Sequence, residues 1–298
     1  MRTPPASPGS PHFTGQFLEI VLWPYLHAMD IKILCPLWGH EHVETGVFID
    51  RVKAAGYHGL DAWIPEDRAA RKTFLDQLEQ NELLFIVQQH QAGGETFAAF
   101  KESFLHYLGL CAEARPMLIN SHTGRDYFTF AQNLELIDLA ANFSQREGIP
   151  VVHEIHRGRF TYHPSVLMEY MEVRPDLLLT ADLSHWVCVT ESMLENFTEP
   201  LGLAIGRARH VHARVGFEEG PQVPDPRAPE WETTTGRHLQ WWDRIVEARR
   251  KKGAEMLTFT TEFGPPPYLP REPFTQRPVA DQFEINCYMK DLLLQRYG

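Results

Sequence analysis

Short apolar runs and amphipathic stretches alternate along the chain from residue 31 to its end. The apolar runs are rich in Ile, Val and Leu, as buried strands are, and are centred near residues 33, 60, 86, 119, 152, 180, 210 and 259. Apolar positions at helical spacing predict intervening helices near 47–55, 66–81, 95–113, 129–147, 164–173, 190–206, 231–252 and 279–296. The pattern therefore predicts eight successive strand–helix units.

The spacing of the predicted strands indicates their arrangement. Neighbouring centres lie about 26–33 residues apart, which suits a strand, a crossover helix and two loops. Only the last gap is longer, because residues 215–230 form a loop rich in Pro and Glu. Eight such units predict an α/β protein with one domain, a (β/α)8 TIM barrel over residues 31–298. An open doubly wound sheet is the alternative, but no Gly-rich phosphate-binding motif follows any predicted strand.

Residues 1–30 precede this pattern and are interpreted as an N-terminal tail and entry segment. The first 15 are rich in Pro, Ser and Gly and lack the apolar stretch of a secretion signal. The cysteines are widely spaced and form no CxxC pair, which favours reduced thiols and a cytoplasmic location. No apolar run approaches the roughly 18 residues of a membrane span, so no membrane partner is expected.

The net charge of the chain limits which classes of partner it is expected to bind. The chain has 28 basic and 39 acidic residues and a formal net charge of −11. A nucleic-acid-binding surface needs clustered Lys and Arg to neutralise phosphates, so we expect no nucleic-acid partner. The sequence leaves the oligomeric state open, a homo-oligomer included.

The fifth to eighth predicted strands each lead into a side chain that can bind a metal. These side chains are Glu154, Asp182, His212 and Glu262. Such residues are poor core residues unless something pairs them. The carboxyl ends of barrel strands meet at one mouth. The conjunction predicts one divalent-cation site with mixed nitrogen and oxygen ligands, Mn²⁺ in the first place and Mg²⁺, Co²⁺ or Zn²⁺ as alternatives.

The segments around these residues resemble the xylose-isomerase-like TIM-barrel superfamily, the sugar phosphate isomerases/epimerases. The similar segments are HEIHRGR (153–159), TADLSHW (180–186), HVHARVG (210–216) and TTEFGPP (260–266), in the family's order. The spacing from Asp182 to His185 is the most specific part. The resemblance implies that the four candidate ligands bind one divalent metal, and that His185 and Arg214 contact substrate oxygens.

Further residues are expected to line the substrate pocket. We assign His122, His156 and Trp38 to substrate binding, at or near predicted strand ends. Trp38, Trp63 and Trp186 have two open interpretations, because each can be a core aromatic or part of an apolar wall on which a sugar face stacks.

These groups predict a metal-dependent sugar isomerase or epimerase with a small carbohydrate substrate. The cation would polarise a substrate carbonyl and stabilise an enediolate. Glu154 and Glu262 would act as acid and base, one removing a proton from carbon and the other returning it. Elimination from the same enediolate gives the alternative, a lyase or dehydratase acting on keto-sugars, keto-inositols or oxidised glycosides.

A more distant alternative is a hydrolase resembling the endonuclease IV branch of the superfamily, which His90 and His122 suggest. That branch needs three zinc ions and an Asp-x-His pair after strand 7, where this chain reads VPDPR (223–227). A non-catalytic sensor is disfavoured because the acid/base pair is complete.

The loops after the last two strands bear on the substrate. Barrel phosphate sites usually use backbone N–H groups there. Here the loops contain Glu218, Glu219, Asp225 and the run Pro265–Pro267. They offer negative charge and few donors, so we expect a substrate without a phosphate.

Overall fold

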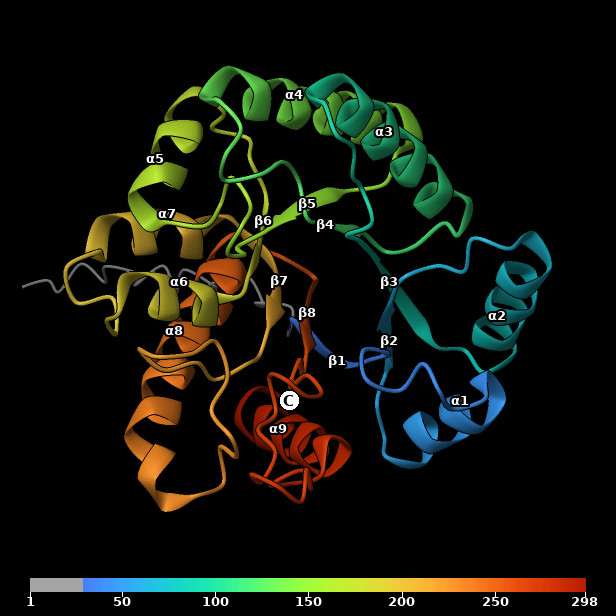
Figure 1. Ribbon diagram of the computed structural model, residues 1–298, viewed down its shortest axis with the longest axis vertical. Helices are drawn as coiled ribbons and strands as arrows, with labels where there is room; N and C mark the ends of the chain where they lie inside the picture. Colours follow the sequence, from blue (N-terminus) through green and yellow to red (C-terminus); the bar gives the residue numbers. More distant parts are fainter. Residues whose placement is uncertain (1–28) are drawn as a thin grey trace, which may run out of the picture.

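Each strand of the central sheet pairs in parallel with its neighbours in the chain, and the last strand pairs with the first (Figure 1). The computed structural model describes residues 29–298. Of the predicted tail and entry segment over residues 1–30, residues 1–28, on which the expected lack of a secretion signal falls, lie outside the described residues, and Asp30 belongs to β1. The strands are β1 (Asp30–Pro36), β2 (Gly59–Ala62), β3 (Leu84–Gln89), β4 (Ile119–Ser121), β5 (Val151–Glu154), β6 (Leu179–Ala181), β7 (Ala208–His212) and β8 (Met256–Thr260). The predicted TIM barrel is confirmed.

Helices surround the barrel and follow the strands in turn (Figure 1). They are α1 (Thr45–Ala54), α2 (Arg68–Gln80), α3 (Phe97–Glu113), α4 (Phe130–Glu147), α5 (Pro164–Val173), α6 (Leu183–Thr190), α7 (Thr198–Arg207), α8 (Glu232–Lys251) and α9 (Gln282–Tyr297), with a short 3-10 turn at Pro229–Trp231. None within residues 29–298 has the length and apolar character needed to cross a bilayer.

Local sequence explains where the helices begin and end. The side chains of Asp67 and Thr96 accept hydrogen bonds from the first turns of α2 and α3. Thr129 and Gln132 form a reciprocal capping box at the start of α4. Gly148 ends that helix in the left-handed conformation, with Pro150 just beyond.

The bounds predicted for the helix over 190–206 were wrong. The structure instead has α6 directly after β6, and α7 begins only at residue 198. Asp182 caps α6 by accepting a hydrogen bond from the backbone N–H of Ser184, and Leu183, Trp186 and Val187 are buried along it. Glu191 then ends the helix with φ of 47°.

The barrel interior has an apolar layer below a polar one. Leu34, Ile86, Leu118 and Val152 form a separate buried cluster. Side chains two positions apart in a strand point to the same face. Gln88, two residues after Ile86, and Glu154, two after Val152, are therefore also directed into the barrel, nearer its carboxyl end. The alternation places polar groups at the mouth above an apolar floor.

Candidate metal centre

The four predicted ligands meet at the carboxyl ends of their strands. Glu154 and His212 are the last residues of β5 and β7, Asp182 follows β6 directly, and Glu262 lies two residues after β8. All four are buried, and one ligand atom from each lies within 4.8 Å of the ligand atoms of the others. The strand order thus brings these side chains around a common point.

The contacts of His212 test whether this group fits a cation. Its Nδ1 lies 2.7 Å from Glu262 Oε2 and 3.6 Å from Glu154 Oε1. Despite the short distance, neither His212 Nδ1 nor Glu262 Oε2 has a hydrogen-bond partner. Buried polar atoms without partners are costly. Orphaned nitrogen and oxygen atoms that converge in this way are the donor set of a mixed-ligand divalent cation, so the residues fit the metal that the sequence predicts.

Charge within the cluster shifts the pKa values of its members. Burial lowers the pKa of His212, but the carboxylates of Glu262 and Glu154 outweigh it and hold that pKa well above its usual value. Burial raises the pKa of the Asp182 carboxyl to about 6, against the opposing charge of Arg214. Glu154 also lies fully buried, yet His122 and His212 hold its pKa well below the usual range. The cluster therefore concentrates negative charge in a buried site.

Glu154 is held firmly by neighbouring donors. Its Oε2 accepts hydrogen bonds from Asn120 Nδ2 at 2.6 Å and from His122 Nε2 at 2.8 Å. Arg159 lies 3.2 Å from His122 Nδ1 and can only donate, so Nδ1 accepts and the ring proton is on Nε2. The predicted substrate-binding residue His122 thus orients Glu154. Its other oxygen, Oε1, is the one that faces His212.

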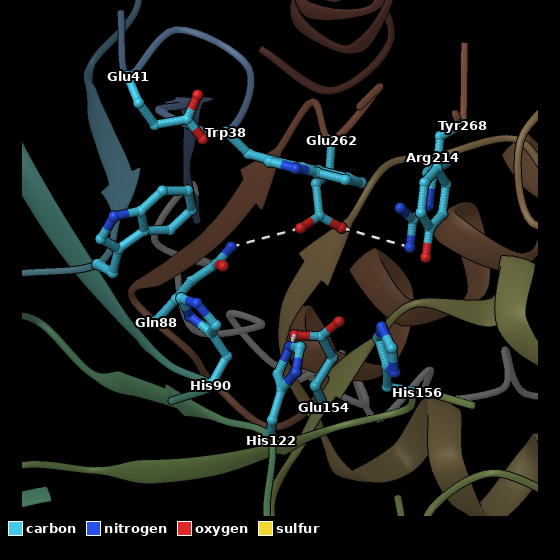
Figure 2. A pocket seen from close by; sticks show the side chains of 11 residues that line it. Trp38, Glu41, Gln88, His90, His122, Glu154, His156, Arg214, Glu262 and Tyr268 are labelled. Atoms are coloured by element: carbon cyan, nitrogen blue, oxygen red, sulfur yellow. Dashed lines mark hydrogen bonds and ion pairs between the residues drawn. The ribbon is translucent and has the colours of Figure 1, made fainter. Parts of the chain in front are cut away.

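Glu262 has fewer partners. Its Oε1 accepts one long hydrogen bond, 3.3 Å, from Gln88 Nε2. Its Oε2 lies 3.6 Å from the guanidinium of Arg214. Figure 2 shows Glu262 and Glu154 approaching the same space from two sides, with Gln88 beside the first. The two carboxylates share a pocket but differ in how tightly the protein holds them.

Arg214 occupies a buried position beside Asp182. Its guanidinium donates to the Asp182 carboxylate and to His185 Nε2, the latter at 2.8 Å, and its Nε donates to Ser184 Oγ at 3.2 Å. Arg214 lines the pocket, whereas His185 is completely buried. The centroid of its ring lies 3.9 Å from that of the His156 ring. The two residues that the resemblance assigned to substrate thus differ in access to the pocket.

A pocket of about 260 Å³ opens over the cluster (Figure 2). Its wall combines aromatic rings and polar groups, namely Trp38, Glu41, Trp63, Gln88, His90, His122, Glu154, His156, Arg214, Glu262 and Tyr268. Trp38 and Tyr268 meet edge to face, with centroids 4.9 Å apart. Trp186 is fully buried and donates to a backbone carbonyl, so it is a core aromatic. The segments after β1, β2 and β8 supply the aromatic side chains, namely Trp38, Trp63 and Tyr268, and residues 215–230 contribute no lining.

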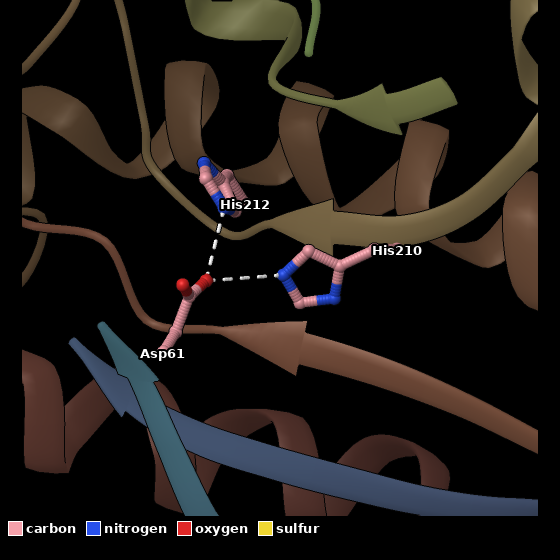
Figure 3. A group of neighbouring side chains, drawn as sticks. All are labelled: Asp61, His210 and His212. Carbon is pink, nitrogen blue, oxygen red and sulfur yellow. Dashed lines mark hydrogen bonds and ion pairs between the residues drawn. The ribbon is translucent and has the colours of Figure 1, made fainter. Parts of the chain in front are cut away.

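Three polar residues at the centre were not predicted from sequence. Gln88 and Asn120 contact the two glutamates, and Asp61 in β2 lies beneath His212 (Figure 3). Asp61 Oδ2 accepts from Thr260 Oγ1 at 2.7 Å. Burial raises the pKa of Asp61, but hydrogen bonds from the neighbouring histidines outweigh it, and the pKa lies below its usual value. The available signal was a carboxylate inside an otherwise apolar strand.

No family model and no curated protein matches this chain by sequence. Solved structures match its fold. A xylose isomerase-like TIM barrel protein from Mycobacterium smegmatis in complex with magnesium is 11% identical, with a TM-score of 0.61 over 92% of this chain and 99% of that one. The 3-keto-D-glucoside 4-epimerase YcjR from E. coli is 12% identical, with a TM-score of 0.56 over 89% and 100%.

A third structure of this fold is of a probable dehydratase. The probable 3-DHS dehydratase AsbF of petrobactin synthesis, from Bacillus anthracis, is 13% identical, with a TM-score of 0.56 over 90% of this chain and 100% of that one. Matches at such identity establish a shared fold. The resemblance to xylose-isomerase-like barrels is therefore confirmed at the level of architecture.

Proposed function

We propose that this protein is a divalent-metal-dependent sugar isomerase or epimerase in which Glu154 and Glu262 carry protons. The observation that carries the proposal is their convergence in one pocket. Each contributes a carboxylate to the buried cluster and also lines the cavity above it. The proposal is supported by the fold, which the chain shares with the 3-keto-D-glucoside 4-epimerase YcjR.

Four residues would hold the cation: Glu154, Asp182, His212 and Glu262. When bound there, it supplies a Lewis acid that makes hydrogen on the carbon next to a carbonyl more acidic. The protein fixes the remaining geometry. Asn120 and His122 hold one oxygen of Glu154, which leaves the other directed at the cluster. Gln88 orients Glu262 from the opposite side.

The two glutamates perform complementary proton transfers. One removes the proton from the carbon next to the carbonyl, and the other returns a proton. Return to the opposite face of that carbon gives epimerisation. Return to the neighbouring carbon gives isomerisation, in which the hydroxyl proton of the first carbon also moves to the former carbonyl oxygen. No proton is gained or lost overall, because the carboxylate that accepts one is balanced by the carboxyl that gives one.

The pocket favours a sugar without a phosphate. The backbone N–H of Phe263 donates to Asn286 Oδ1 at 3.0 Å, and that of Gly264 donates to Gln222 Oε1 at 2.7 Å. Backbone donors after β8, which barrels commonly offer to phosphate, are thus already used. The guanidinium of Arg214 is taken up by Asp182 and His185.

The contacts of His122 disfavour the multi-zinc hydrolase alternative. A metal ligand must present a lone pair, but Arg159 donates to His122 Nδ1 and leaves the proton on Nε2, the atom that faces Glu154. This nitrogen is therefore a hydrogen-bond donor to Glu154, and a second cation bridging the two would have to break that arrangement.

The test is solvent exchange catalysed by purified protein with Mn²⁺ in D₂O, using ketoses, 3-keto-glycosides and keto-inositols as substrates. After Mn²⁺ is removed from the reaction mixture, NMR should show deuterium at the substrate carbon next to the carbonyl, together with an epimer or positional isomer. Loss of a β-substituent would instead identify a lyase. Chelator-treated protein is the control. Absence of exchange on every substrate with metal bound would refute the proposal.

A further inference from the structure

A buried carboxylate below the metal centre has no role in the proton transfers. Asp61 lies in β2, opposite the strands that supply the ligands, and is 1% exposed. Its Oδ2 lies 3.2 Å from His212 Nε2 and accepts from Thr260 Oγ1, while its Oδ1 has no hydrogen-bond partner (Figure 3). Burying a carboxylate with an unpaired oxygen is costly for stability alone. This cost points to a function for the charge.

The chemistry of the pair fixes the proton on the imidazole. An ionised carboxylate can only accept, so the 3.2 Å contact with Asp61 Oδ2 requires a proton on His212 Nε2. The Asn120 amide Nδ2, a donor, lies 3.4 Å from the same nitrogen, but it already donates to Glu154 at 2.6 Å, so the shorter, charged contact with Asp61 decides the tautomer. The lone pair available to a cation is then on Nδ1, which faces Glu262 and Glu154. Ring orientation and proton position agree, because the nitrogen nearest the other ligands is the one without a hydrogen bond.

We propose that Asp61 is a positioning residue that holds the proton of His212 on Nε2 and presents Nδ1 to the cation. This rests on the proposed metal centre. His210, two positions before His212 in β7, places its Nε2 3.4 Å from the same Asp61 oxygen, while its Nδ1 faces the backbone carbonyl of Thr258 at 3.0 Å. Carboxylates that accept the second ring N–H of a metal-binding histidine raise its basicity and fix its tautomer.

The group of Asp61, His210 and His212 is an alternative cation site by proximity. However, Asp61 Oδ2 already accepts from Thr260, and the nitrogen that His212 turns towards it carries the proton. We therefore expect one cation per chain, bound above this group.

The experiment measures Mn²⁺ affinity by competition with a fluorescent chelator, without an activity readout. Asp61→Asn keeps the size of the side chain but removes its charge, and should weaken binding about 10–100-fold. Thr258→Val is the matched control. It removes a buried hydroxyl 2.7 Å from His210 Nδ1 without touching His212, and its affinity should equal that of the wild type. His212→Gln should abolish tight binding.

A second measurement does not depend on whether the variants fold. In wild-type protein loaded with diamagnetic Zn²⁺, ¹⁵N NMR of labelled histidines should show His212 protonated on Nε2. Three outcomes would overturn the role of Asp61 alone. They are protonation of His212 on Nδ1, binding of two cations per chain, and an Mn²⁺ affinity that is unchanged in folded Asp61→Asn although His212→Gln abolishes binding. Failure of the wild type to bind a cation, or binding indifferent to His212→Gln, would overturn the metal centre and this inference with it.

Discussion

Substituting Gln for Glu154 and for Glu262 separately should have different consequences, because the two carboxylates have different neighbours. In Glu154→Gln, the oxygen that faces Asn120 Nδ2 and His122 Nε2 must remain an acceptor. The amide oxygen therefore takes that position, and the NH₂ group points to the cluster in place of a ligand oxygen. Reversing the amide would leave the His122 Nε2–H unpaired, because Arg159 keeps the ring proton on that nitrogen, whereas Asn120 can reverse its own amide to accept.

The magnitude follows from the His122 donor. An unsatisfied buried donor costs about 1–3 kcal/mol, so the reversed amide is disfavoured by about 2 kcal/mol. Since about 1.4 kcal/mol is a factor of ten in an equilibrium constant, metal affinity should fall about 30-fold. Activity should fall with it.

Glu262→Gln should leave metal binding largely intact. Its one side-chain donor, Gln88, makes a long hydrogen bond and can reverse its own amide to accept instead. An oxygen can then stay directed at the cluster, while the base is lost. We expect kcat to fall about 10²–10⁴-fold, the usual scale for a general acid or base. This corresponds to about 3–5 kcal/mol of barrier.

The assay is Mn²⁺ affinity by chelator competition beside kcat for the substrate found by the exchange screen. Gln88→Ala is a control that removes the donor to Glu262 without changing either carboxylate. Equal metal affinities in the two Gln variants would refute the inference that their different hydrogen bonds make only Glu154 essential for tight metal binding. Near wild-type turnover by metal-loaded Glu262→Gln would refute its role in proton transfer.

Three further outcomes are expected. His238 is fully buried with its pKa lowered to about 4, chiefly by burial, so its stabilising effect is complete above its ordinary pKa of about 6.5 and is lost as pH falls from 6.5 to 4. In urea titrations at several pH values, His238→Gln should reduce this pH-dependent loss of unfolding free energy by about 3 kcal/mol at most. An unchanged dependence of the unfolding free energy on pH would contradict the prediction. Chelation should lower Tm by several degrees, since a ligand at 100 times its Kd adds about 2.7 kcal/mol; a Tm indifferent to EDTA in protein shown to hold metal would contradict it. Steady-state kinetics should show no preference for a sugar phosphate over its free sugar, and a tenfold preference would overturn the pocket assignment.

The strands were predictable because barrel strands are buried on both faces and recur at regular intervals. Helix ends followed from caps such as Thr129 and Gly148. The exception is α6, where Asp182 was interpreted only as a ligand. The same carboxylate also caps a helix, so the turn containing His185 is helical and folds inward, and that histidine lies away from the pocket.

The convergence of the four candidate ligands was predictable because consecutive parallel strands bring their carboxyl ends to one mouth. The support beneath them was not. Asp61 and Asn120 lie in strands whose pattern indicates apolar core, and their contacts with His212 and Glu154 cross the barrel between distant segments. The pairing of Arg214 with Asp182 likewise depends on how a loop turns after β7, which spacing along the chain does not determine.

Charge in the barrel mouth connects these contacts to the proposed cation. Four carboxylates, those of Asp61, Glu154, Asp182 and Glu262, are at least 95% buried there, and Arg214 is the guanidinium buried among them. With neutral imidazoles, four negative charges and one positive charge leave −3, and a divalent cation reduces this to −1. Buried charge without compensation is costly, and a proton on His212 offsets only one unit. The same buried negative charge thus destabilises the metal-free fold and favours binding of a divalent ion. Chelation should therefore lower the stability of the protein as well as its activity.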